Sequence, residues 1–207
     1  MRFSVFPAEK TSLDSTYTGG PTPELAISPD GYQLAFVASY PGSPRLIWVR
    51  ALDSAVAQPL RGTEGARFPF WSADGHFIGF FAGGKLKKID ASGGTAEAVV
   101  DAPDGRGGTW APDGTIVYAE NIAGGLKRVA AAGGTPRDVT VLDTARGEIS
   151  HRFPQFLPGG RHFVFINRAA SEAMGLYVAS LDSTQKKRLL ASNWSTASVT
   201  AEYLLSA

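Results

Sequence analysis

The sequence contains no cysteine, no long apolar run and almost no net charge. Without cysteine the chain can form neither disulfides nor thiolate metal sites. This absence is compatible with either an intracellular or a secreted protein. No apolar stretch approaches the roughly 20 residues that a membrane-spanning helix needs. A formal net charge of +1 provides no global field that would attract nucleic acid or an anionic membrane. We therefore expect neither nucleic-acid binding nor membrane contact by this segment.

Targeting and catalytic signatures are also missing. Met1–Pro7 carries a positive charge but is not followed by an apolar stretch, so we do not expect a signal peptide. The chain has no G-x-S-x-G nucleophile elbow, no H-E-x-x-H zinc motif and no EF-hand loop. These absences predict no catalytic residues, no bound metal and no cofactor.

Glycine and proline are abundant among short β-rich runs. The 207 residues include 24 glycines and 13 prolines, and 43% of all residues are hydrophobic. Such a composition is typical of a globular protein with many short strands joined by tight turns.

One turn motif recurs along the chain. Ile27–Gly31 reads I-S-P-D-G, and related segments occur at Trp71–Gly75, Trp110–Gly114 and Phe156–Gly160. Their closing glycines follow one another at intervals of 44, 39 and 46 residues. A period of about 40–45 residues predicts one four-stranded β-propeller blade per repeat.

The chemistry of a tight turn explains this motif. Proline presets the first corner of a type I turn, aspartate takes the next corner, and glycine accepts a positive φ. Asp30, Asp74 and Asp113 could instead be calcium ligands or catalytic acids. Their spacing places them on separate blades, so we interpret them as turn residues. Trp71, Trp110 and Phe156 end the innermost strands, where we expect them to pack one blade on the next.

The repeat predicts an all-β chain of four-stranded antiparallel blades, with four full blades and a partial fifth. The expected divisions are an N-terminal strand and loop over 1–22, blade 1 over 23–65, blade 2 over 66–106, blade 3 over 107–151, blade 4 over 152–194, and the partial blade 5 over 195–207. The expected inner strands are 23–28, 66–71, 107–111, 152–157 and 195–200. Arg2–Pro7 is expected as an extra strand and Thr11–Pro23 as a polar loop.

A partial fifth blade permits two arrangements. The chain is either an open arc cut from a longer propeller, or a small ring in which Arg2–Pro7 pairs with the C-terminal strands. We favour the open arc because a single N-terminal strand cannot supply the two strands that the last blade needs. An open arc exposes apolar blade faces, through which we expect self-association.

The repeated motif, followed by strands such as Gln33–Ala38, resembles the WD40-like repeat of TolB-type propellers. A more specific likeness is to the C-terminal propeller behind the kinase domain and membrane helix of many bacterial serine/threonine protein kinases. Six segments, in chain order, carry that likeness: Arg2–Pro7, Leu25–Gly31, Leu46–Arg50, Phe68–Ser72, Gly107–Trp110 and His151–Pro154.

The kinase resemblance implies a sensory or docking module, which would lie outside the cytoplasm if it belongs to a membrane-anchored kinase. The chain departs from a kinase in every catalytic motif, because it has no glycine-rich loop, no H-R-D and no D-F-G. The fourth turn, Leu157–Gly160, also lacks the aspartate of the repeat. Kinase chemistry is therefore not expected in these residues.

The loops that join each outer strand to the next inner strand carry the most distinctive polar residues. In a propeller these loops gather around the mouth of the channel, where arginines could hold a carboxylate or phosphate bidentately. An alternative is that the arginines pair with Glu64, Asp104 and Glu148. The candidate ligand-binding residues are Arg67, Arg106, Arg146, His151 and Arg152.

The remaining polar residues are expected to be structural. His76 and His162 begin second strands on different blades, and His151 is expected in the loop that enters the fourth blade, so the three histidines should not share a metal. Two basic clusters are expected at solvated blade edges, where lysine discourages strand pairing. They are Lys85, Lys87 and Lys88, and Lys186, Lys187 and Arg188.

Three functions are compatible with these observations. The first is a non-catalytic propeller that binds a protein or small-molecule ligand, as the kinase resemblance implies. The second is an accessory propeller of a prolyl-oligopeptidase-like hydrolase. The third is a propeller polysaccharide lyase or glycosidase, which would need convergent carboxylates at the channel. Only Glu64, Asp104 and Glu148 are candidates for that role, and each lies near an arginine in the sequence.

Overall fold

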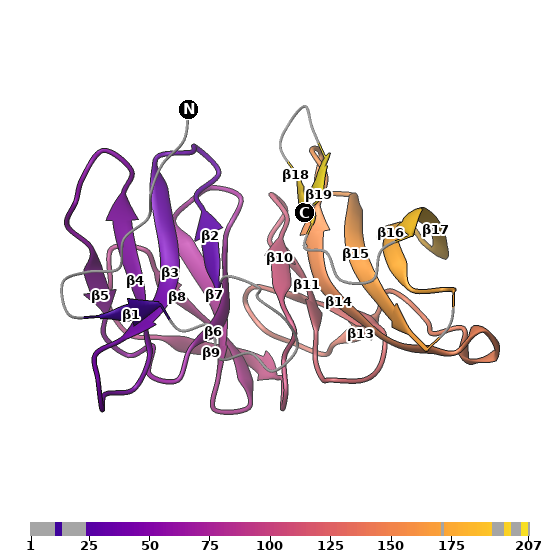
Figure 1. Cartoon of the computed structure of the whole chain (residues 1–207), viewed down its shortest axis with the longest axis horizontal. Helices are drawn as coiled ribbons and strands as arrows, with labels where there is room; N and C mark the ends of the chain where they lie inside the picture. Colours follow the sequence, from indigo (N-terminus) through magenta and orange to yellow (C-terminus); the bar gives the residue numbers. More distant parts are fainter. Residues whose placement is uncertain (1–10, 14–23, 171, 192–196, 200–203, 207) are drawn as a thin grey trace.

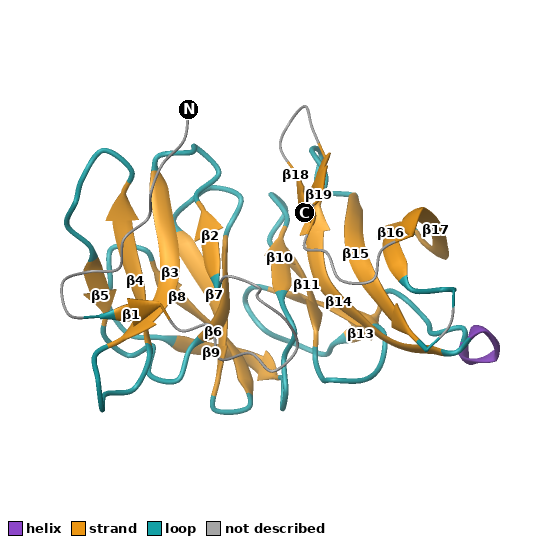
Figure 2. Cartoon of the chain, viewed as in Figure 1, coloured by secondary structure: helices purple, strands orange, loops and turns teal. Residues whose placement is uncertain are grey.

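The computed structural model describes residues 11–13, 24–170, 172–191, 197–199 and 204–206. Every element in this part of the chain is a β-strand, apart from one 3₁₀ helix of three residues (Figures 1 and 2). Four antiparallel sheets follow one another along the chain, and a two-stranded sheet comes after them. The predicted all-β propeller architecture is therefore confirmed. Arg2–Pro7, the expected extra strand, lies outside the described residues.

We call the four sheets blades 1 to 4. Blade 1 contains β2 (Leu25–Ile27), β3 (Gln33–Ser39), β4 (Leu46–Ala51) and β5 (Gln58–Leu60), with β1 (Ser12–Leu13) paired to β3. Blade 2 contains β6 (Arg67–Trp71), β7 (Phe77–Ala82), β8 (Lys85–Asp90) and β9 (Glu97–Asp101).

Blade 3 contains β10 (Gly108–Trp110), β11 (Thr115–Ala119), β12 (Leu126–Ala130) and β13 (Arg137–Asp138). Blade 4 contains β14 (Glu148–Phe156), β15 (His162–Ala169), β16 (Gly175–Ser180) and β17 (Ser183–Ala191). The 3₁₀ helix η1 (Thr144–Arg146) precedes blade 4, and β18 (Ala197–Val199) pairs with β19 (Leu204–Ser206) after it.

The repeated turns are closed by their own side chains. In blade 1 the Ser28 hydroxyl donates to Asp30 Oδ1 at 2.5 Å, and the same oxygen accepts the Tyr32 amide at 3.0 Å. Asp74 is held in the same way in blade 2, by Ser72 at 2.5 Å. The Ser28 hydrogen bond is the main reason that the pKa of Asp30 lies below its ordinary value. These aspartates therefore shape the turns.

The core consists of apolar side chains that pack between successive blades. Between blades 1 and 2, Ala35 and Ile47 lie against Ile78 and Phe80. The indole of Trp71 extends this contact, since its Nε1 donates to the Ala26 carbonyl of blade 1 at 3.0 Å. Burial of apolar area in such faces is the main source of stability in a propeller.

The leading face of blade 1, defined as the face turned away from blade 2, differs from its counterparts. Ile27 pairs with Leu34 as Trp71 pairs with Ile78, so the two pairs occupy equivalent positions. Trp71 is 7% exposed because blade 1 covers it, whereas Ile27 is 58% exposed. Blade 1 therefore presents an apolar position that is covered in blade 2.

Two expected loops differ from the structure. Ser12 and Leu13, expected within a loop, form β1 against Ala38 and Ser39. The inner strand of blade 4 begins at Glu148 and not at residue 152, so His151 lies in a strand. No helix among the described residues is long and apolar enough to cross a membrane.

The early start of β14 has a clear physical cause. Gly124, in the loop between β11 and β12, bridges to Ser150. Its amide donates to the Ile149 carbonyl at 3.1 Å, and its carbonyl accepts the His151 amide at 2.9 Å. The backbone of blade 3 thus supplies partners that extend the strand. The resulting pairing with β15 contains two register shifts.

Candidate functional site

The inner strands of blades 2, 3 and 4 share a local conformation. Each has an arginine four residues before its terminal aromatic residue, and the next residue has a positive φ. That φ is 49° at Phe68, 88° at Gly107 and 50° at Phe153. Phenylalanine rarely adopts such values, and backbone strain of this kind often occurs at functional sites. The three arginines are Arg67, Arg106 and Arg152.

The three positions with positive φ lie close together. The rings of Phe68 and Phe153 make an edge-to-face contact with centroids 5.4 Å apart. The Phe153 amide donates to the Arg106 carbonyl at 2.9 Å. A Cβ on Gly107 would lie 2.8 Å from Phe153 Cδ1, so this position has no room for a side chain. The inner strands of blades 2, 3 and 4 therefore pack closely against one another at Phe68, Gly107 and Phe153.

Arg67 and Arg106 lie around the same aromatic ring. Their guanidinium carbons are 5.0 Å and 6.0 Å from the centroid of Phe68. Arg106 is buried and forms a bidentate ion pair with Asp104, with Nη2 2.8 Å from Oδ2. Arg67 is half-buried and lies 3.8 Å from the buried carboxylate of Glu24. Both arginines thus have partners within the chain.

Arg152 joins two blades. Its buried side chain donates to Ser150 Oγ at 2.8 Å and to the Ile122 carbonyl of blade 3 at 2.5 Å. Because both acceptors belong to the chain itself, Arg152 holds the loop between β11 and β12 against β14.

Arg146 is not near the other candidate arginines. It is exposed in η1, which lies at the right-hand margin of the fold in Figure 2, just before the start of β14. The chain after β13 runs toward β17, where Lys186 Nζ donates to the Val141 carbonyl at 2.7 Å. The predicted set therefore separates into Arg67 and Arg106 at Phe68, Arg152 between blades, and Arg146 at the periphery.

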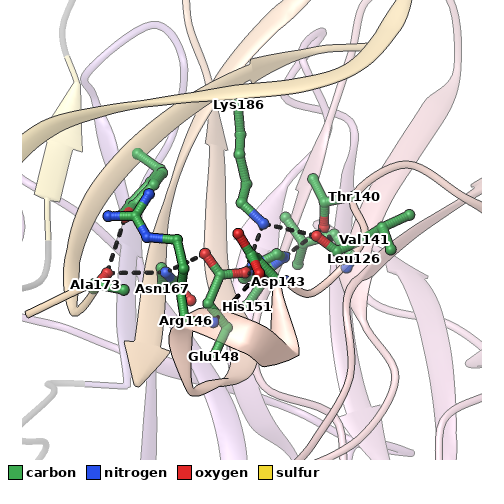
Figure 3. Close-up of polar contacts among 11 residues, drawn as sticks. Leu126, Thr140, Val141, Asp143, Arg146, Glu148, His151, Asn167, Ala173 and Lys186 are labelled. Atoms are coloured by element: carbon green, nitrogen blue, oxygen red, sulfur yellow. Dashed lines mark hydrogen bonds and ion pairs between the residues drawn. The ribbon is translucent and has the colours of Figure 1, made fainter. Parts of the chain in front are cut away.

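Glu148, at the start of β14, has four polar partners among the described residues (Figure 3). Its Oε2 lies 2.5 Å from Lys186 Nζ, 2.7 Å from the Asp143 amide and 3.3 Å from His151 Nε2. Its Oε1 accepts the Asn167 amide at 2.9 Å. We call Glu148, His151, Asn167 and Lys186 the Glu148 cluster. Three strands of blade 4 contribute to it.

His151 is completely buried within this cluster and is neutral. Thr140 Oγ1 accepts the Leu126 amide at 2.8 Å, which leaves its hydroxyl free to donate to His151 Nδ1 at 2.7 Å. Nε2 then carries the proton that faces Glu148. Burial lowers the pKa of His151 to about 4, and the charge of Lys186 acts in the same direction.

Glu148 is ionised despite its burial. Burial by itself raises the pKa of this carboxyl, but the hydrogen bonds from Lys186 and from the Asp143 amide outweigh it, and the net pKa lies below its ordinary value. The cluster thus contains one carboxylate, one ammonium and a neutral imidazole. Its charges cancel within blade 4.

Lys186 and Asn167 were not among the residues selected from the sequence, although they complete the cluster. Asn167 pairs with His151 in the register of β14 and β15, and Lys186 comes from the outer strand. The K-K-R run predicted a solvated edge, but Lys186 and Arg188 turn inward, to Glu148 and to the Met174 carbonyl, and only Lys187 is exposed. The contacts in this cluster depend on the register of strands that are far apart in the sequence, and no local sequence pattern reveals that register.

The acidic and histidine side chains of the described residues do not gather into a metal site. They contain no group of three or more histidine, aspartate and glutamate side chains that could hold a metal. Asp104 pairs with Arg106, and Glu148 pairs with Lys186. Glu64 accepts the amide of Gly62 at 3.2 Å within its own exposed loop. Each of the three candidate carboxylates is thus engaged locally.

No family model and no curated protein matches the chain. Solved structures do match. A TolB protein of Agrobacterium tumefaciens has a TM-score of 0.64 at 17% identity over 82% of this chain and 62% of its own. TolB of Acinetobacter baumannii has a TM-score of 0.60 at 19% identity, covering 79% and 42% of the two chains. A puromycin-hydrolyzing peptidase of Mycobacterium tuberculosis has a TM-score of 0.58 at 15% identity, covering 84% and 30%.

These likenesses concern the fold. The chain spans less than two thirds of the length of each of these three structures. At identities of this size, function does not follow from fold. The chain has the β-propeller fold, of the kind found in TolB.

Proposed function

We propose that this chain is a non-catalytic β-propeller module that binds another protein. The observation that carries the proposal is the internal pairing of the charged groups at the inner strands. Arg106 is bidentate to Asp104, and Glu148 accepts hydrogen bonds from Lys186 and Asn167. A general acid or base must reach its substrate, and these groups are already engaged with their own chain. These paired groups instead hold the inner strands in place, so that the blades can present a rigid surface to a partner protein.

The finer proposal is a sensory or docking module of a receptor-like serine/threonine kinase. It is supported by the chain order of the segments from Arg2–Pro7 to His151–Pro154 that resemble such propellers. The parent reading frame tests this proposal directly. A kinase domain and a membrane helix upstream would support it, and a parent frame with neither would overturn it.

An accessory propeller of a peptidase is the second candidate. The specific observation in its favour is the similarity to the propeller portion of a puromycin-hydrolyzing peptidase. In that setting blades would control access to a separate catalytic domain. An α/β-hydrolase domain downstream in the same reading frame would favour this candidate over the kinase.

Assays with panels of substrates test whether the chain lacks catalytic activity. The purified chain is assayed with peptide, glycoside and polysaccharide substrates, and we expect no turnover. Turnover that disappears in Asp104→Asn or Glu148→Gln, with the circular dichroism spectrum unchanged, would overturn the proposal. A variant at the exposed loop, Glu64→Gln, serves as the matched control because Glu64 bonds only to its own loop.

A further inference from the structure

The outer strand of blade 4 differs from the outer strands of the other blades. β17 has nine residues, whereas β5, β9 and β13 have three, five and two. Proline, which cannot donate a backbone hydrogen bond, lies within β5 as Pro59 and directly before β13 as Pro136. β17 contains no proline. Blade 4 therefore has the longest free edge.

This edge is accessible. Among the described strands, β17 pairs only with β16, and it lies at the right-hand margin of the fold in Figure 1. Seven of its nine residues are exposed. A strand at the edge of a sheet carries backbone N–H and C=O groups that can pair with an added strand.

The side chains of β17 define what could pair with it. The strand contains three basic residues and no acidic residue. Lys186 and Arg188 turn inward, to Glu148 at 2.5 Å and to the Met174 carbonyl at 2.8 Å. Lys187, between them, is exposed. Beyond it, Leu189 and Leu190 are 40% and 44% exposed, which adds an apolar end to a basic centre.

A second copy of the same strand is a poor partner. Lys187 is the central residue of β17, so two copies paired antiparallel about their centres would place Lys187 opposite Lys187, and Lys186 opposite Arg188. Like charges directly opposite each other in a sheet are destabilising. The exposed charge of Lys187 favours a strand with an acidic residue at its centre, which gives selectivity as well as attraction.

We propose that β17 is a docking edge for an extended acidic segment of a partner protein, which adds a fifth strand to blade 4. The inference deepens the proposed function and rests on it, since it names the surface and the chemistry of the partner. Backbone pairing along Ser183–Ala191 supplies most of the affinity. An acidic side chain opposite Lys187 and an apolar side chain opposite Leu190 set the register.

A peptide titration tests this proposal. The probe is a fluorescent nine-residue peptide of alternating valine and glutamate with threonine at both ends, added to the ¹⁵N-labelled chain. We expect saturable amide shifts centred on residues 183–191, with weaker binding at higher salt. The same peptide with lysine in place of glutamate should bind about tenfold more weakly. Shifts centred elsewhere, no shifts at millimolar peptide, or equal binding of the two peptides would each overturn the proposal.

Charge reversal provides the matched control. Lys187→Glu should invert the preference between the two peptides, whereas Lys87→Glu, on the middle strand β8 of blade 2, should leave it unchanged. An unchanged preference in Lys187→Glu would overturn the proposal. If the peptide fails while the substrate panels show no turnover, the docking edge is wrong and the non-catalytic module stands. Turnover on those panels would overturn the module independently of the peptide result.

Discussion

Lys186 Nζ lies 2.5 Å from Glu148 Oε2, and this ion pair joins the outer strand of blade 4 to the start of its inner strand. The Glu148 carboxylate is almost completely buried, and the lysine side chain is 14% exposed. Because both charged groups are largely buried, removal of either one would leave the other without a counter-ion and away from water. The pair links the segment before β14 to the sheet that follows it.

Removing the charge of Glu148 should destabilise the chain. Glu148→Gln leaves Lys186 buried without a counter-ion, and we expect a loss of about 3 kcal/mol in the free energy of unfolding. Urea denaturation measures this loss. The control is Asp101→Asn, which breaks the exposed pair with Lys85 and should cost less than about 1 kcal/mol. Equal effects of the two substitutions would contradict the assigned role of Glu148.

His151 should make stability depend on pH. Its pKa falls from 6.5 to about 4 on folding, so the unfolded chain binds more protons between these values. Stability contributed by the neutral imidazole is complete above pH 6.5, declines as the pH falls to 4, and changes no further below that. The total is on the order of 3 kcal/mol.

Denaturation at a series of pH values tests this dependence. In His151→Gln the decline between pH 6.5 and pH 4 should largely disappear. His76→Gln, at an exposed histidine, is the control and should retain the decline. A decline of the same size in His151→Gln would mean that another group is responsible.

Gly107 should tolerate alanine less well than Gly114. The two glycines have nearly the same φ, 88° and 85°, but only Gly107 has Phe153 within contact of a Cβ. Gly114→Ala should cost about 1 kcal/mol through its backbone conformation alone. Gly107→Ala adds steric overlap with Phe153, and we expect a further loss of about 1–3 kcal/mol. Thermal denaturation distinguishes the two, and equal losses would contradict the tight fit of the inner strands.

Arg106 and Arg146 should behave differently on substitution. Arg106→Ala leaves Asp104 without its bidentate partner and should destabilise the chain by about 2 kcal/mol. Arg146→Ala, at the exposed helix η1, should change stability by less than about 0.5 kcal/mol.

Titration with inorganic phosphate tests the alternative of an arginine ring. Binding that is lost in both variants would support a shared anion site.

Ile27 should promote self-association, although Leu34, Phe36 and Trp48 on the same leading face of blade 1 are buried. Ile27 is exposed at a position equivalent to buried Trp71, so we expect the chain to associate reversibly as its concentration rises. Ile27→Asp should weaken this association, as measured by sedimentation velocity. Val56→Asp, at an exposed position outside the regular strands of blade 1, should not. A chain that stays monomeric at all concentrations would contradict the prediction.

Much of the fold could be predicted from local sequence. The turn at Ile27–Gly31 recurs with its Ser–Asp hydrogen bond at Ser72 and Asp74, because the chemistry of a tight turn is contained within five residues. The position of Trp71 directly before its turn likewise predicted that it packs between blades, as the structure shows. Errors occurred where partners came from another blade. His151 was expected in a loop because nothing near it in sequence reveals the backbone of Gly124.

The candidate site depended on tertiary structure. Arg106 and Asp104 are two residues apart, and sequence reasoning already offered their pairing as an alternative. Arg146 is only six residues from Arg152, yet the chain turns outward and separates them. The Glu148 cluster unites residues from β14, β15 and β17, whose contacts depend on strand register. Local chemistry therefore determined the blades and their turns, whereas long-range pairing decided which charged groups meet, because register is set by the packing of whole sheets.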